Sequence, residues 1–110
     1  MRGKYKAAFI IPKGSNKVLG EEGWEFVSDF RLSPAEKEYL IETLKLEFVE
    51  HYLGIDSYVG ENIKMSVTYD DQNNIENIYF QLYENALNNL EEIYLGGKLT
   101  SDSEFFIPNP

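Results

Sequence analysis

The pattern of apolar and polar positions predicts three β-strands most directly. Residues 5–11, YKAAFII, are apolar at nearly every position, which is typical of a strand covered on both faces. Residues 63–69 and 78–83 alternate apolar and polar side chains on either side of the polar turn DDQNN. This arrangement predicts a β-hairpin with one buried and one wet face.

A further strand is predicted over residues 24–32, after the glycine-rich connection 12–23, which we expect to be a loop. Its alternation places four apolar residues on the core side: Trp24, Phe26, Phe30 and Leu32. Glu25 and Asp29 then point outward about 13 Å apart. That distance is too wide for an acid and a base that act on one bond.

A long helix is predicted to start at Ser33 and to end near Leu53, before Gly54. Ser33 is a good cap, Pro34 suits the first helical position, and Glu36 completes a capping box. The apolar residues of this helix form two nearly opposite stripes. The first is Leu40, Ile41, Leu44, Phe48 and Tyr52, and the second is Tyr39, Leu46, Val49 and Leu53.

Two apolar stripes require two coverings. The sheet can cover one, and a second helix or the C-terminal tail can cover the other. Alternatively, a partner or a second copy of the chain covers the second stripe. Residues 84–95 supply a second helix, and the tail SEFFIPNP supplies a short strand or a docked aromatic plug.

Together these elements predict one α+β domain over residues 1–110. We expect an antiparallel sheet of four to five strands with two helices packed on one face, in the order ββαββα with an optional last strand. The other face would present polar side chains and the tyrosines Tyr79 and Tyr83.

Charge is distributed unevenly along the chain. The net charge is −9, yet residues 1–20 contain five bases and no acid, while the remaining residues contain five bases and nineteen acids. The basic start either lies against the protein's own acidic surface or binds phosphate. Tyr79 and Tyr83 are suited to base stacking, but direct nucleic-acid binding requires a basic surface, so we do not expect it.

The residues also disfavour several classes of chemistry. Cysteine is absent, no apolar run is long enough to cross a bilayer, and the apolar run 7–11 is shorter than a signal-peptide core. We therefore expect a cytoplasmic protein without membrane contact. The only histidine, His51, is expected near the end of the long helix in a structural role.

No catalytic, cofactor or metal site is predicted. Asp70, Gln72 and Asn74 have the spacing of the first calcium-loop ligands, but the required glycine and the distal glutamate are missing. The stretch KGSNKVLG lacks the residue order of a phosphate loop. We therefore expect a protein that is not an enzyme.

Acidic residues interspersed with tyrosines suit the basic groove of another protein. We expect a small acidic domain that acts by occupying another macromolecule. Such domains include inhibitors of nucleic-acid or defence enzymes, of the kind that phages and mobile elements carry, and immunity proteins that neutralise a toxin. The contact residues that we predict for the basic partner are Glu21, Glu22, Glu25, Asp29, Glu36, Tyr79 and Tyr83.

Three alternatives remain at this point, of which one is a small enzyme that uses acidic residues. A structural or adaptor subunit could form a homodimer through the second stripe: Tyr39, Leu46, Val49 and Leu53. An acidic surface can also serve solubility alone.

Overall fold

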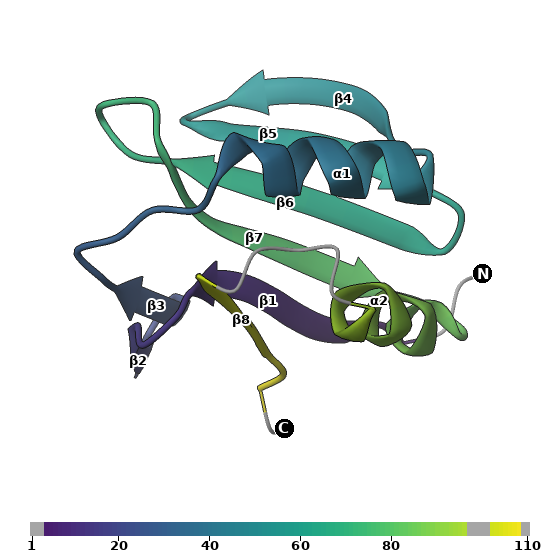
Figure 1. Cartoon of the computed structure of the whole chain (residues 1–110), viewed down its shortest axis with the longest axis horizontal. Helices are drawn as coiled ribbons and strands as arrows, with labels where there is room; N and C mark the ends of the chain where they lie inside the picture. The colour runs from purple at the N-terminus through teal and green to yellow at the C-terminus, as the bar shows by residue number, and fades with distance from the viewer. Residues whose placement is uncertain (1–3, 97–101, 109–110) are drawn as a thin grey trace.

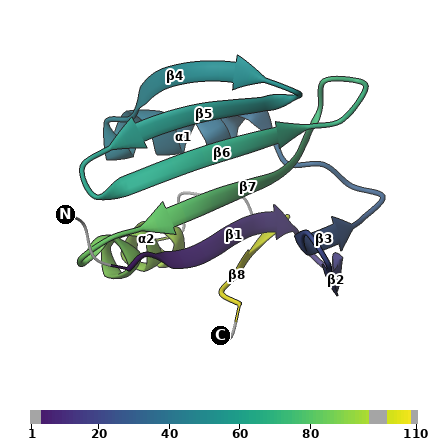
Figure 2. The same cartoon turned by 180° about the vertical axis from the view of Figure 1, so that it is seen from behind.

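The computed structural model describes residues 4–96 and 102–108 of the chain. The elements in chain order are β1 (Lys6–Pro12), β2 (Asn16–Gly20), β3 (Gly23–Val27), α1 (Pro34–Leu44), β4 (Glu47–Tyr52), β5 (Ile55–Gly60), β6 (Ile63–Tyr69), β7 (Ile75–Leu82), α2 (Ala86–Leu95) and β8 (Ser103–Phe106). Six strands form one antiparallel sheet in the order β4-β5-β6-β7-β1-β8, and β2 pairs only with β3. Both helices lie on one side of the large sheet (Figures 1 and 2).

The α+β class is confirmed, but the predicted order ββαββα with four to five strands is wrong. The described residues form eight strands and two helices. One extra strand, β2, lies in the connection that we expected to be a loop, where it forms a hairpin with β3. The other two are β4, which replaces the second half of the expected long helix, and its neighbour β5.

Helix α1 begins where the sequence predicts, and it ends earlier than predicted. The Oγ of Ser33 accepts a hydrogen bond from the backbone N–H of Ala35 at 3.1 Å, as a capping serine should. Lys45 then adopts a left-handed conformation with φ 53°, which stops the helix. Leu46 turns into the core with 7% of its surface exposed, and the chain continues as strand β4.

The turn after β4 explains why Gly54 does not act as a helix stop. Leu53 and Gly54 both have positive φ, 51° and 76°, as the two central residues of a type I′ hairpin turn require. The turn pairs β4 with β5, and the backbone N–H of Tyr69 donates to the Gly54 carbonyl at 2.8 Å. The apolar residues that suggested a helix therefore belong to a strand.

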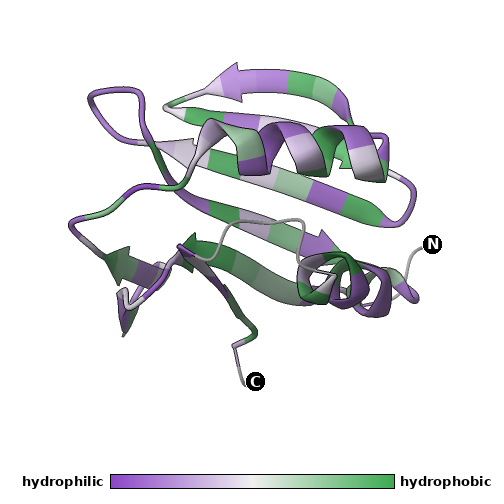
Figure 3. Cartoon of the chain, viewed as in Figure 1, coloured by the Kyte–Doolittle hydropathy of each residue, from purple (hydrophilic) through white to green (hydrophobic). Residues whose placement is uncertain are grey.

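The main core lies between the sheet and the two helices. Ile10, Met65 and Phe80 come from three adjacent strands, and each has 0% of its surface exposed. Leu40 of α1 and Leu90 of α2 cover them from the helical side and are also fully buried. The alternation of hydrophilic and hydrophobic residues along the strands appears as purple and green bands in Figure 3. Within the described residues, neither helix has the length and apolar character needed to cross a membrane.

A smaller aromatic cluster lies on the other face of β1, where the β2–β3 hairpin covers it. The ring centroid of Phe9 is 4.8 Å from that of Phe26 and 5.0 Å from that of Tyr79. Phe106 of β8 completes the cluster, 5.0 Å from Trp24. Strand β1 is thus covered on both faces, as its apolar run predicts.

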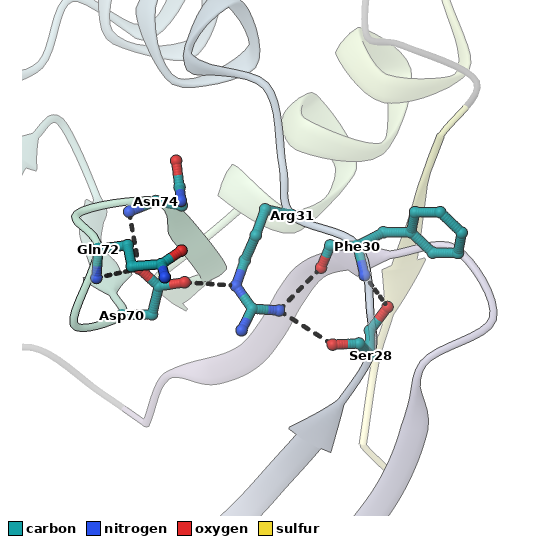
Figure 4. A network of polar contacts seen from close by, with 6 residues as sticks. All are labelled: Ser28, Phe30, Arg31, Asp70, Gln72 and Asn74. Carbon is teal, nitrogen blue, oxygen red and sulfur yellow. Dashed lines mark hydrogen bonds and ion pairs between the residues drawn. The ribbon is translucent and has the colours of Figure 1, made fainter.

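The predicted strand over residues 24–32 is only partly correct. Trp24 and Phe26 face inward as expected, but β3 ends at Val27. The Oγ of Ser28 accepts a hydrogen bond from the Phe30 N–H at 3.0 Å, and the Phe30 ring points away from Arg31 and Asp70 (Figure 4). Phe30 is 70% exposed, so its assignment to the core is wrong.

Candidate functional site

The β2–β3 hairpin presents the predicted carboxylates at the surface. Glu21 and Glu22 form its tip, Glu25 lies on β3, and Asp29 follows the end of β3; all four are exposed. Because Trp24 and Phe26 pack inward, the side chain between them, Glu25, points to the outer face. Glu21 and Asp29 lie at opposite ends of the hairpin, so they form an extended acidic surface rather than a compact ligand set.

Large apolar side chains are exposed on both faces of the hairpin and directly after it: Val18 and Val27 share the outer face with Glu25, whereas Leu19 is the cross-strand partner of the inward-facing Trp24. Val18 and Val27 are 50% and 60% exposed, Leu19 is 65% exposed and Phe30 is 70% exposed. Val18 is the cross-strand partner of Glu25, which places an apolar group beside a charge on the outer face. We call these eight residues the hairpin patch: Val18, Leu19, Glu21, Glu22, Glu25, Val27, Asp29 and Phe30.

The bases next to the hairpin patch in sequence are engaged elsewhere. Lys17 Nζ lies 3.3 Å from Glu104 Oε2, and Arg31 Nε lies 2.8 Å from Asp70 Oδ2. Neither of these carboxylates belongs to the hairpin patch. The four carboxylates of the hairpin patch are themselves exposed, and Lys13 lines a hollow together with Asp29 and Phe30.

The structure does not join the other predicted contact residues to the hairpin patch. Glu36 is 2% exposed and lies within the protein, where its charge is one of the factors, after burial, that raise the pKa of Tyr94. Tyr79 packs on Phe9 beneath the hairpin. Tyr83 lies at the other end of β1, with its ring 6.0 Å from that of Tyr5.

The second apolar stripe does not exist as a helix face. Tyr39 packs against the core from α1, and Leu46 belongs to the core itself. Val49 and Leu53 lie on and just after β4, the outermost strand of the large sheet, with exposed fractions of 52% and 80%. All six residues of β4 are exposed, and they include Phe48 and Tyr52.

His51 is not at a helix end, so the role that we predicted for it is wrong. It lies on β4 opposite Asp56 of β5, and its Nδ1 is 2.5 Å from Asp56 Oδ1. The pair lines a hollow of about 490 Å³ beside the first turn of α1. We call this hollow the α1–β4 cleft.

A second polar pair lines the same cleft. The ammonium group of Lys37 donates a hydrogen bond to the phenol oxygen of Tyr69 at 3.0 Å. This hydrogen bond is the main reason that the pKa of Lys37 lies above its usual range, so Lys37 remains protonated. The cleft therefore brings together side chains from α1, β4, β5 and β6.

The turn between β6 and β7 uses its carboxylate for structure. Asp70 Oδ1 accepts hydrogen bonds from the backbone N–H groups of Gln72 and Asn74, both at 2.9 Å, and Oδ2 accepts from Arg31 (Figure 4). Mainly because of Arg31, the pKa of Asp70 lies below its ordinary value. Among the described residues, no three His, Asp or Glu side chains are grouped so that they could hold a metal ion.

Sequence reasoning missed the α1–β4 cleft because it assigned residues 47–53 to a helix. One signal was available: in HYLGID, a two-residue Leu-Gly turn makes positions 51 and 56 cross-strand partners. No model of a protein family, no curated protein and no solved structure matches this chain.

Proposed function

We propose that this protein acts by binding another, basic protein and that the hairpin patch is its contact surface. The observation that carries the proposal is that the hairpin and the residues directly after it expose four large apolar side chains and four carboxylates, with Val18, Glu25 and Val27 together on the outer face. Protein contacts commonly combine a few apolar anchors with a polar rim. The carboxylates would increase the rate of encounter, and the apolar groups would slow dissociation.

The chemistry of the partner follows from the charge of the chain. The net charge is −9, and Lys17 and Arg31 are already paired with carboxylates outside the hairpin patch. A basic surface, such as the nucleic-acid groove of an enzyme or the active face of a toxin, would be attracted to the hairpin patch. This supports the role of an inhibitor or an immunity protein, which acts by occupying that surface.

The test combines capture of partners with charge reversal. Wild-type protein is used to capture partners from the organism that encodes the chain, and the captured protein is purified for rate measurements. The variant carries Glu22→Lys, Glu25→Lys and Asp29→Lys. A matched control reverses three exposed carboxylates elsewhere, Glu42, Glu61 and Glu92.

We expect the hairpin variant to associate with the partner at least about tenfold more slowly, with a weaker dependence on salt. The control has the same net charge and should retain most of the wild-type rate. Equal slowing in both variants would show that only the total charge matters, and an unaffected hairpin variant would place the contact elsewhere. Capture alone, without this difference, does not support the proposal.

A second candidate function is self-association through the β4 edge. The observation that favours it is the free outer edge of β4, with Phe48, Val49 and Tyr52 exposed by 58%, 52% and 65%. Edge strands of this kind pair readily with other strands. However, a pair of β4 strands would also bring together Glu47 and Glu50 from both copies.

Sedimentation at two ionic strengths separates the two functions. A dimer formed by apolar edges should persist or tighten in high salt, because salt screens the repulsion between carboxylates. Binding to a basic partner should instead become slower. A protein that remains monomeric at all concentrations tested would contradict the second candidate function and leave the first unaffected.

A further inference from the structure

The α1–β4 cleft has features that protein binding through the hairpin patch does not use. Its volume of about 490 Å³ is within the range of small-ligand sites. Its polar groups come from α1, from the β4–β5 hairpin, from β6 and from the turn before β7, and the tertiary fold brings them together. The α1–β4 cleft is therefore a site separate from the hairpin patch.

Lys37 and the ring of His51 are two of the polar groups that line the cleft. Lys37 is protonated and has three N–H donors, of which Tyr69 accepts one. Asp56 engages Nδ1 of His51, which leaves Nε2 as the ring nitrogen that can meet a ligand. Because the His51 side chain is 58% exposed and that of Asp56 only 17%, the ring lies on the open side of the pair.

The remaining lining is partly apolar. Leu32 and Ile75 are joined by a β-bridge and are buried, with 5% and 3% of their surface exposed. Pro34 lines the cleft above them at the start of α1. A ligand with one polar end and an apolar body would match both parts of the lining.

The charges within the cleft indicate which charge the polar end of the ligand should carry. Lys37 supplies one positive charge to the cleft, and the Asp56 carboxylate faces Nδ1 of the His51 ring. Glu38, 3.7 Å from Lys37, has a side chain that is 68% exposed and is therefore strongly screened by solvent. A single negative charge is thus a better match than the double charge of a phosphate group.

We propose that the α1–β4 cleft binds the carboxylate group of a small organic acid, with Lys37 as the charged hydrogen-bond donor, with the His51 ring beside it at the open side of the cleft, and with Leu32, Pro34 and Ile75 against the apolar body. Charge-assisted hydrogen bonds of this kind are among the stronger polar contacts. The inference extends beyond protein binding and does not depend on it.

The experiment uses benzoate as a probe and NMR signals of the His51 ring as the readout. His51 is the only histidine in the chain, so its ring signals can be assigned without ambiguity. For a ligand of this size we expect a saturable shift with a Kd on the order of 1 mM. Benzamide, which has the same shape without the charge, should give no saturable shift over the same range.

Variants test the assigned donor. Lys37→Gln should weaken benzoate binding at least about tenfold, and Tyr69→Phe should weaken it several-fold by removing the hydroxyl that positions the ammonium group. Lys64→Gln is the matched control, because Lys64 is exposed on the sheet face away from the helices and does not line the cleft. If Lys37→Gln does not fold, the affinity of Tyr69→Phe for benzoate alone decides whether the proposal holds.

Three results would overturn the proposal. One is the absence of a saturable shift at about ten times the expected Kd, and another is equal binding of benzoate and benzamide. The third is wild-type affinity in both Lys37→Gln and Tyr69→Phe. Inorganic phosphate is a further probe: if it binds more tightly than benzoate, the choice of a singly charged group is wrong.

Discussion

The hairpin patch and the β4 edge both expose large apolar side chains, but the surroundings of those side chains differ. The hairpin is a separate two-stranded sheet held to the body by Trp24 and Phe26, and it and the residues directly after it expose four carboxylates together with large apolar groups. Strand β4 continues the large sheet, and it adds an unpaired backbone edge to its apolar side chains. The same kind of exposure therefore predicts two different kinds of contact.

The difference shows how the charge of the hairpin patch and the backbone edge of β4 each restrict the kind of partner that can bind. A basic globular surface can approach the hairpin patch without changing its own secondary structure, because the contact is made by side chains. The β4 edge instead suits an extended segment that can join the ladder of backbone hydrogen bonds. The bulge at Val49, where the pairing of β4 with β5 shifts register, makes the β4 edge less regular.

The first prediction concerns a substitution that weakens the packing of the β2–β3 hairpin against the large sheet. Phe26→Ala should lower the free energy of unfolding by about 2 kcal/mol, less than for a fully buried phenylalanine because Phe26 is only half-buried. Its ring contacts with Phe9 and Phe106 would be lost. Chemical denaturation measures the effect.

Phe30→Ala is the matched control, since the same change is made four residues later on an exposed side chain. It should alter the free energy of unfolding by no more than about 0.5 kcal/mol. Equal destabilisation by the two substitutions would mean that the aromatic cluster does not anchor the hairpin.

The second prediction tests the apolar part of the hairpin patch. Phe30→Ser should speed dissociation from the basic partner about tenfold, equivalent to about 1.4 kcal/mol, because an anchor side chain would be lost. Leu95→Ser is the control: Leu95 is 80% exposed on α2, away from the hairpin patch. Surface plasmon resonance gives both dissociation rates, and the same rate in both variants would remove Phe30 from the contact.

The sequence predicted elements well where one pattern dominated. The continuous apolar run of β1, the alternation in β6 and β7, and the Ser33 cap each had one interpretation, and the structure contains all of these elements. The exposed carboxylates of the hairpin could be placed because Trp24 and Phe26 fixed the direction of Glu25.

The sequence failed where two periods fitted the same residues. Leu44, Phe48 and Tyr52 recur every four residues, as on a helix, but Phe48 and Val49 also favour a strand. Pairing of β4 with β5 across the Leu53–Gly54 turn and burial of Leu46 decide between the two, and the burial of Leu46 depends on the assembled core. The α1–β4 cleft was missed for the same reason, since it requires His51 on a strand.

The third prediction separates folding from binding at the β4 edge. Leu53→Asn should raise the free energy of unfolding by about 0.5 to 1 kcal/mol, because asparagine tolerates the positive φ of the type I′ turn better than leucine does. It also removes an apolar side chain that is 80% exposed. Thermal unfolding and sedimentation together would show a more stable fold with weaker self-association, whereas unchanged self-association would exclude this part of the β4 edge from the dimer contact.

The last and smallest effect concerns the link between the two regions. Arg31 follows the hairpin and forms an ion pair with Asp70, and the neighbouring residue Tyr69 is hydrogen-bonded to Gly54 in the turn after β4. The native pKa of Asp70 lies below its ordinary value of 3.8, so the carboxylate favours the folded state above that pH. This contribution should be lost as the pH falls through the lower native pKa.

Asp70→Asn should therefore make the protein slightly less stable than wild type at neutral pH, and the difference should disappear in acid. Thermal midpoints of both proteins between neutral pH and about pH 2 give the comparison. Asp71→Asn is the control, because Asp71 is the exposed neighbour in the same turn. A difference between Asp70→Asn and wild type that persists at the lowest pH would mean that the asparagine disturbs the turn itself, and that the lost stability does not come from the charge of Asp70 beside Arg31.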